Sequence, residues 1–125
     1  MKDLNSLLLD AEIFVMQGNN VEALKLLDDA ERIANKDQRI EQLAAIYFKK
    51  GNVLSVMGSA EEARNNYQAA LSVYEELLRA DPENLKCQEN VALTETNLGN
   101  MLKDMGRIEE AKNSYEAALT LRRGF

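Results

Sequence analysis

Two acidic pairs are the groups in this chain that come nearest to general acid–base chemistry. Glu61–Glu62 and Glu109–Glu110 each place two carboxylates next to one another, the kind of group that moves protons in catalysis. Each pair also follows a glycine by a few residues, where a helix is expected to begin. One glutamate then serves the helix start and the other is favoured by the helix dipole. We therefore interpret both pairs as helix starts.

The remaining candidate for chemistry is a single thiol. Cys87 is the only cysteine and the chain has no histidine, so no intrachain disulfide exists and no imidazole can activate the thiol. One thiol with carboxylates is a poor zinc or iron set, and no phosphate-binding glycine loop is present. We predict no catalytic residue, no metal site and no cofactor, and a structural role for Cys87. The chain is not expected to be an enzyme.

Composition limits the remaining classes. The chain has 125 residues, 46% of them hydrophobic and 29% charged, and a net charge of −6, which fits one soluble domain over residues 1–125. Residues 1–35 carry three basic and seven acidic side chains. This disfavours nucleic acid and weakly favours a basic or neutral partner, but solvated helix faces kept soluble by charge are the preferred explanation. No apolar run is long enough to span a membrane, and the first residues lack a secretion signal. We expect a cytoplasmic protein.

An internal repeat dominates the sequence. Residues 51–71 return as residues 99–119, 48 positions later, and 13 of the 21 positions are identical. A weaker copy follows Gly18, with matching residues at the same offsets. Three copies are about the minimum with which such units bury their faces on one another. Arrays of this kind form extended surfaces, and such surfaces usually bind proteins.

The spacing of apolar residues predicts helices that end at the turn glycines Gly18, Gly58 and Gly106. Three antiparallel hairpins follow, at about 3–35, 37–80 and 83–122. The six expected helices are 3–17, 20–35, 37–57, 60–80, 83–105 and 108–122.

Three sequence patterns predict how these helices begin. Ser59 with Glu62 forms a capping box, Asn19 with Glu22 offers the same arrangement, and Asp81 before a proline is a third start.

Small residues indicate close packing within the hairpins. Ala63 is expected to face Gly51, and Ala111 to face Gly99, so that the two backbones can approach. Tyr67 and the equivalent Tyr115 would then fill the space one turn further on. Core packing is the expected role of these tyrosines, and an exposed functional tyrosine is the alternative.

These positions together resemble the tetratricopeptide repeat family. The motif positions are filled by Leu98-Gly99, Leu102, Gly106, Ala111, Tyr115 and Ala118, and in the preceding copy by Tyr47, Lys50-Gly51, Leu54, Gly58, Ala63, Tyr67 and Ala70. The copies are offset by 40 and 48 residues instead of the usual period of about 34. This is similar to the long-helix subgroup, such as kinesin light chains and the cell-polarity scaffolds with Leu-Gly-Asn repeats. Glu95 departs from the motif, since a large aromatic is expected there. The resemblance implies an all-α fold, a right-handed superhelical α-solenoid of stacked hairpins.

The resemblance also implies a concave groove lined by the first helix of each hairpin. Asn52 and Asn100 each follow a glycine at equivalent positions, and an amide can both donate to and accept from a peptide backbone. Bonding within their own helix neighbourhood is the alternative. The carboxylate-binding site of some family members is not expected, because only Lys103 is basic here. The predicted peptide-binding residues are Leu8, Glu12, Phe48, Asn52, Ser55, Leu93, Thr96, Asn100 and Lys103.

We therefore expect a scaffold that binds a peptide or a partner protein in this groove. The alternative is a self-associating array, or a piece of a longer repeat protein, without a peptide ligand of its own. The stripe of Ile108, Ala111, Tyr115 and Leu119, here called the C-terminal edge, would mediate homo-oligomer formation. A soluble monomer results instead if the hairpin's own first helix buries that stripe.

Overall fold

A computed structural model describes residues 3–122 and contains six α-helices within that range. The predicted all-α fold is confirmed. The largest error in a helix boundary is at the third helix, predicted from residue 37 and observed from Ile40. The ends of the predicted domain, residues 1, 2 and 123–125, lie outside the described residues. The helices are α1 (Leu4–Met16), α2 (Asn20–Lys36), α3 (Ile40–Val56), α4 (Ala60–Ala80), α5 (Leu85–Asp104) and α6 (Ile108–Arg122).

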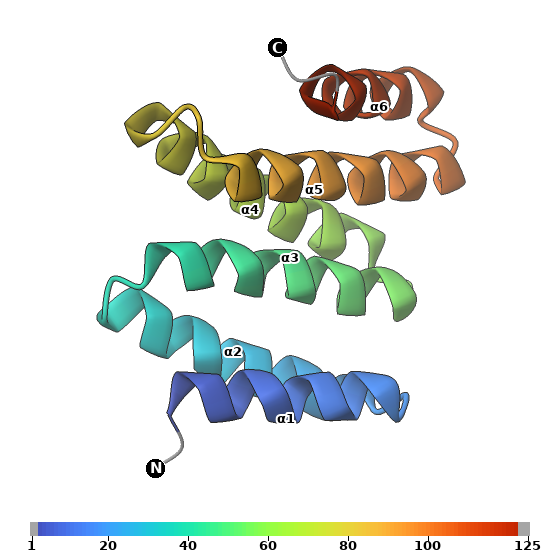
Figure 1. Ribbon diagram of the computed structural model, residues 1–125. Coiled ribbons are helices and arrows are strands. Elements are labelled where there is room, and N and C mark those ends of the chain that lie inside the picture. Colours follow the sequence, from blue (N-terminus) through green and yellow to red (C-terminus); the bar gives the residue numbers. More distant parts are fainter. Residues whose placement is uncertain (1–2, 123–125) are drawn as a thin grey trace.

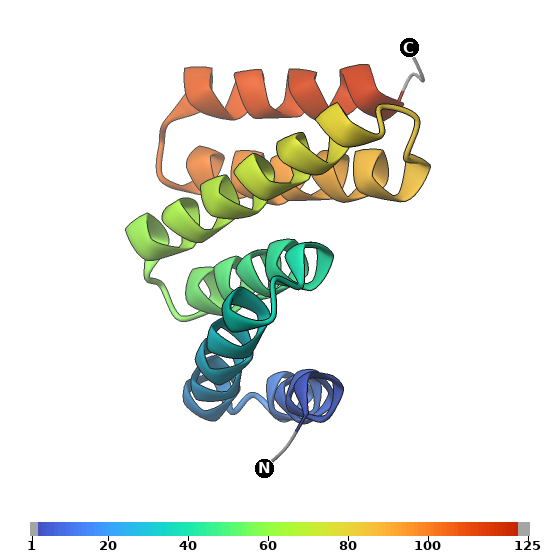
Figure 2. The same cartoon turned by 90° about the vertical axis from the view of Figure 1, so that its left-hand side faces the viewer.

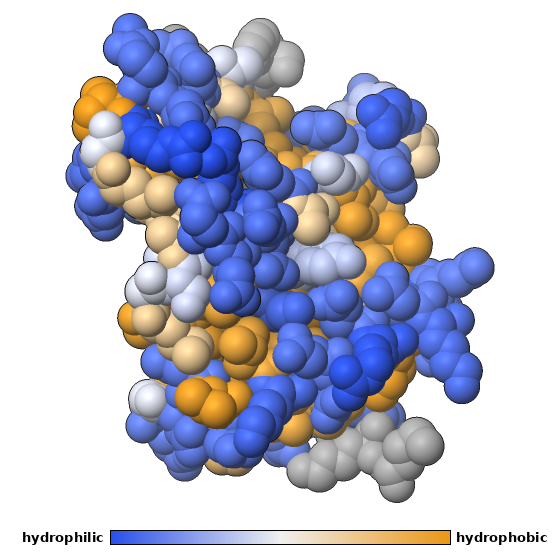
Figure 3. All heavy atoms as spheres, turned by 180° about the vertical axis from the view of Figure 1, so that it is seen from behind, coloured by the Kyte–Doolittle hydropathy of each residue, from blue (hydrophilic) through white to orange (hydrophobic). Residues whose placement is uncertain are grey.

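The helices form an α-solenoid in which each helix packs mainly against the helices that precede and follow it. α1, α3 and α5, the first helices of the three hairpins, lie one above another in front of α2 and α4 (Figures 1 and 2). From behind, the surface is mostly hydrophilic, with hydrophobic residues exposed between the charged ones (Figure 3). The contacts of one hairpin with the next are what a stacked repeat requires.

The three turn glycines end their helices as predicted. Gly18, Gly58 and Gly106 have φ of 75°, 83° and 80°, a left-handed conformation that side chains disfavour. At the central turn, the backbone N–H of Ser59 donates to the carbonyl of Leu54 at 2.9 Å, which satisfies a helix-end acceptor. Gln38 takes the same role between α2 and α3, with a φ of 53°. Nothing in the sequence marks that position, because the residue is not a glycine.

The predicted capping residues are wrong at three places, although α2 and α4 begin at the predicted residues. Neither Ser59 nor Asn19 makes a side-chain capping bond, and Asp81 lies at the end of α4 instead of at the start of α5. Asn84 caps α5 by accepting from the backbone N–H of Cys87 at 3.0 Å. The backbone explains the difference: ψ is 97° at Asn84 but 68° at Ser59. Only the extended geometry aims the side chain at the free N–H groups.

The tyrosines, and not the alanines, are what the helix glycines face. A Cβ atom placed on Gly51 would lie 2.6 Å from Cε1 of Tyr67, and one on Gly99 would lie 2.8 Å from Cε1 of Tyr115. The prediction that Ala63 faces Gly51 is therefore replaced by direct ring-to-backbone packing. Tyr67 is buried, as core packing requires, while Tyr115 is half-buried.

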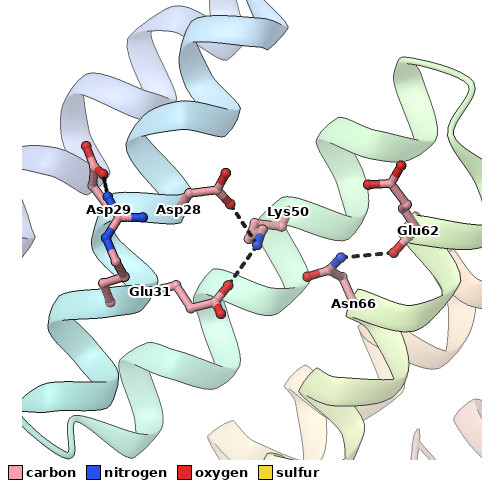
Figure 4. A network of polar contacts seen from close by, with 7 residues as sticks. Asp28, Asp29, Glu31, Lys50, Glu62 and Asn66 are labelled. Atoms are coloured by element: carbon pink, nitrogen blue, oxygen red, sulfur yellow. Dashed lines mark hydrogen bonds and ion pairs between the residues drawn. The ribbon is translucent and has the colours of Figure 1, made fainter.

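An ion-pair cluster joins the first two hairpins. Nζ of Lys50 on α3 lies 2.8 Å from Asp28 and 2.7 Å from Glu31, both on α2 (Figure 4). Burial of Lys50 opposes its charge, but the hydrogen bonds to the two carboxylates outweigh this and raise the pKa of Lys50. The ammonium therefore stays charged at neutral pH and connects two adjacent hairpins.

Candidate functional site

The predicted groove residues all lie on the first helices, and none of them belongs to the buried core. Their side chains are half-buried or exposed, so they are accessible to a ligand. α1 carries Leu8 and Glu12, α3 carries Phe48, Asn52 and Ser55, and α5 carries Leu93, Thr96, Asn100 and Lys103.

Three of these residues meet at one hollow between α1 and α3. Glu12, Phe48 and Asn52 line a space of about 280 Å³. Leu27 of α2 belongs to the same lining and is 1% exposed, so the second helix closes the space from below. The hollow is large enough for an aliphatic or aromatic side chain, and sites for such groups are typically apolar with a few placed polar groups.

The walls and the rim of this hollow differ in character. Val15, Val53 and Val56 supply apolar walls. At the rim, Nζ of Lys49 lies 3.4 Å from Oε2 of Glu12, an exposed ion pair between α3 and α1. Because exposed pairs of this kind are weak, either charge is available to a charged group on a ligand.

Asn52, which lines this hollow, has its amide oxygen already hydrogen-bonded within the protein. Its carbonyl oxygen Oδ1 accepts from the Tyr67 hydroxyl at 2.6 Å and from the amide Nδ2 of Asn97 at 3.0 Å. Within residues 3–122, its own Nδ2 group donates to no partner. The prediction of an amide that both donates and accepts toward a ligand is therefore corrected, since two N–H groups are free and the oxygen is already used.

Asn100 repeats part of this arrangement in the third hairpin. Its Oδ1 accepts from the Tyr115 hydroxyl, as Asn52 accepts from Tyr67. Asn100 is exposed and is not among the lining residues of the hollow between α1 and α3. Thr96 donates its hydroxyl hydrogen to the carbonyl of Ala92 at 2.8 Å, so that hydrogen is used within the helix.

The other predicted residues do not gather at the same place. Leu93 lines a separate hollow with Leu121, and Lys103 lines one at the C-terminal edge. Leu8 and Ser55 line none of these three hollows. The structure thus divides the predicted groove into a compact site at α1 and α3 and scattered positions along α5.

Sequence reasoning missed residues that face a neighbouring hairpin. Lys49, Val53 and Val56 line the site, and the spacing of the two valines by three residues was the available signal. Another hollow of about 280 Å³ lies between the first turns of α3 and α5. It is rich in amides, with Gln42 and Asn90 in its lining.

Cys87 has the structural role that was predicted. It is buried, and its thiol donates to the carbonyl of Tyr74 at 3.4 Å. Burial raises the pKa of the Cys87 thiol, so the reactive thiolate is disfavoured. Among residues 3–122, no cluster of three or more histidine, cysteine, aspartate or glutamate side chains could hold a metal ion. No helix in that range is both long and apolar enough to cross a membrane.

One solved structure has the same fold over almost the whole chain. BtubC (BKLC) from P. vanneervenii is similar in structure, with a TM-score of 0.83 and 20% sequence identity. The match covers 98% of this chain and 46% of BtubC, so the chain spans less than half of that protein's length. MamA matches with a TM-score of 0.45 and 16% identity, over 97% of this chain and 79% of MamA. No curated protein matches by sequence. The profile of the tetratricopeptide repeat family matches residues 42–124, and the chain therefore belongs to the tetratricopeptide repeat family.

Proposed function

We propose that the surface formed by α1, α3 and α5 binds an extended segment of a partner protein. An apolar side chain of that segment enters the hollow between α1 and α3. Family membership supports this proposal, because tetratricopeptide repeats typically act as non-enzymatic interaction scaffolds. The ligand is a peptide with an apolar anchor, and its backbone supplies hydrogen-bond acceptors.

The observation that carries the proposal is the state of Asn52. Two donors hold its Oδ1 in place, one from α4 and one from α5, so the amide of this lining residue has a fixed orientation. A ligand carbonyl bound there meets a donor whose orientation is already set, which lowers the entropic cost of binding. The Asn52 amide binds the backbone of the ligand, and the apolar hollow determines which ligand side chain fits.

Asn52→Asp isolates this donor. The aspartate keeps oxygens that accept from Tyr67 and Asn97 but removes the N–H groups offered to the ligand. Peptides selected on the unaltered chain from a random library would be titrated against the variant by calorimetry. We expect affinity to fall roughly fivefold to a hundredfold, as for a lost hydrogen bond with a partner left unsatisfied, while the melting temperature changes little.

Two further variants complete the test. Val56→Asp puts a charge on the wall of the hollow at an exposed position and should also weaken binding. Asn97→Ala removes one of the two bonds that orient Asn52 but keeps the Asn52 donor, so binding should persist with a smaller loss of affinity than in Asn52→Asp. Selected peptides that bind Asn52→Asp and Val56→Asp as tightly as the unaltered chain would place the binding surface elsewhere.

A self-associating array is the second candidate function. The observation that favours it is the C-terminal edge, where Ile108 and Leu119 are 57% and 49% exposed. Exposed apolar stripes of this kind often mark interaction sites.

A further inference from the structure

The first helix of the chain carries an apolar stripe that no other element covers within the described residues. Leu9, Ile13 and Met16 on α1 are 67%, 51% and 81% exposed. Their spacing of four and three residues places them on one side of the helix. We call these three residues the N-terminal edge. α1 has no basic residue, and its charged side chains are Asp10 and Glu12.

The C-terminal edge at the other end of the array forms a shallow hollow. Ile108, Ala111, Tyr115 and Leu119 line a space of about 300 Å³ together with Lys103, Lys112 and Glu116. Apart from those three side chains, its lining is apolar. An occupant of this hollow must therefore present apolar residues.

The interior of the array shows what covers such a surface. Ala63, Tyr67 and Leu71 on α4 are equivalent to Ala111, Tyr115 and Leu119, each lying 48 residues earlier. The residues on α4 belong to the second hairpin. Leu98 and Met101 on α5, the first helix of the next hairpin, pack against them. Tyr67 is consequently 2% exposed, whereas Tyr115 is only half-buried. Within the described residues, the C-terminal edge thus has the features of a surface that accepts a first helix.

α1 has the features of such a first helix. Met101 lies two residues after Gly99, Val53 two residues after Gly51, and Ile13 two residues after Ala11, the residue at the glycine position of the first copy. Val53 packs against Ala11 and Leu27 of the preceding hairpin, as Met101 packs against Ala63 and Tyr67. Ile13 therefore points away from the array on the side where a preceding hairpin would lie.

Opposite charges also face each other at the proposed junction, if two copies stack as neighbouring hairpins do. Arg64, six residues after Gly58, pairs with Glu110, four residues after Gly106, at 3.1 Å. The equivalent residues at a junction between two copies are Lys112 of one copy and Glu22 of the next. Glu22 makes only an exposed pair with Lys25 at 3.5 Å, which is easily exchanged.

One pair of like charges opposes the contact between two copies. Lys50, one residue before Gly51, meets Asp28 and Glu31 on α2. At a junction between two copies, Asp10 takes the place of Lys50 and meets Glu116 instead. These like charges disfavour docking, so apolar burial is its main favourable contribution.

We propose that the N-terminal edge of one copy docks on the C-terminal edge of a second copy and continues the stack of hairpins. The two surfaces are different, so the contact is heterologous and produces rings or open filaments instead of closed two-fold dimers. This assembly does not depend on peptide binding in the groove.

Two complementary variants test the polarity of the contact. Ile13→Asp blocks the N-terminal edge, and Leu119→Asp blocks the C-terminal edge. Both residues are exposed, so both variants should fold. By sedimentation, the mass of the unaltered chain should rise with concentration, each variant alone should stay monomeric, and an equal mixture should form a one-to-one dimer. That dimer joins the intact N-terminal edge of Leu119→Asp to the intact C-terminal edge of Ile13→Asp.

The other outcomes overturn the proposal. A monomeric unaltered chain at all concentrations removes self-association, and self-association of Ile13→Asp alone shows a symmetric contact between C-terminal edges. Lys112→Glu should weaken association roughly fivefold, the upper range for an exposed pair, and adding Glu22→Lys should restore it. Val56→Asp is the matched control, since it alters the groove and should leave association unchanged. Loss of peptide binding without loss of association, or the reverse, separates the two proposals.

Discussion

The hydroxyl of Tyr67 donates a hydrogen bond of 2.6 Å to Oδ1 of Asn52, and thereby ties the second helix of the hairpin to its first. Asn97 donates to the same oxygen from α5, so one amide carbonyl joins three helices. Burial raises the pKa of Tyr67 to about 12, which keeps the phenol protonated as a donor near neutral pH. The candidate ligand donor on Asn52 is oriented by these contacts.

Tyr67→Phe should lower the free energy of unfolding by about 1 kcal/mol, because Asn52 Oδ1 loses one of its two donors in a partly buried position. Tyr115→Phe is the matched control: it removes the equivalent bond at an exposed site and should cost less. Urea denaturation of both variants measures the difference. Equal losses of stability in the two variants would show that burial of the tyrosine–asparagine hydrogen bond does not determine how much it stabilises the protein.

Gly51→Ala should destabilise the protein by about 1–3 kcal/mol, the usual cost of overpacking. The new Cβ would lie 2.6 Å and 2.7 Å from two ring atoms of Tyr67, and that ring is buried. Gly99→Ala meets Tyr115 at 2.8 Å and 3.0 Å, and the half-buried ring there has room to shift. Thermal melting should rank Gly51→Ala as the more damaging change, and the opposite order would contradict the packing described for the two rings.

Gln38→Gly should stabilise the protein by about 0.5–1 kcal/mol. Gln38 has a φ of 53°, which costs a residue with a side chain about 1–2 kcal/mol, and the larger backbone entropy of glycine in the unfolded chain offsets part of the gain. Gly58→Gln makes the reverse change at an equivalent turn and should destabilise. Melting temperatures that fall in both variants would show that the Gln38 side chain itself contributes to stability.

Glu95→Gln should raise stability at neutral pH. Burial, together with the charge of Glu75, outweighs a hydrogen bond with Ser114 and raises the pKa of Glu95 above 4.5. The unfolded chain then loses this proton at lower pH than the folded one, so ionisation destabilises the fold as pH rises. The advantage of Glu95→Gln should therefore disappear as pH falls toward 4.5. Glu75→Gln should give a smaller gain, and an advantage that is constant with pH would exclude this cause.

The helices could be predicted from the sequence because glycine and apolar spacing act locally. Gly18, Gly58 and Gly106 end their helices by their own conformational freedom, whatever the neighbouring hairpins do. Helix caps were less predictable, because they depend on the backbone angle ψ of the capping residue, which differs by 29° between Asn84 (97°) and Ser59 (68°). Ser59 has a preferred capping residue type but not the backbone geometry, and Asn84 has both.

The candidate site was only partly predictable from the sequence, because its residues come from helices that are far apart in the chain. Glu12 and Asn52 share a hollow because α2 brings α1 beside α3. The same helix positions on α5 carry Asn100, which that hollow does not include. Repeat equivalence fixes which side of a helix a residue occupies. The space between two first helices depends on how the hairpins twist against each other, and local spacing does not contain that information.

Two of the ion pairs that join neighbouring hairpins differ in exposure, and therefore in how strongly dissolved salt weakens them. Lys50 has a side-chain exposure of 15%, so dissolved ions screen its pairs with Asp28 and Glu31 only weakly. At the second junction, the pair between Arg107 and Glu61 is 3.6 Å long, and the glutamate side chain is 69% exposed. Rising ionic strength therefore weakens the pair between Arg107 and Glu61 before it weakens the pairs of Lys50.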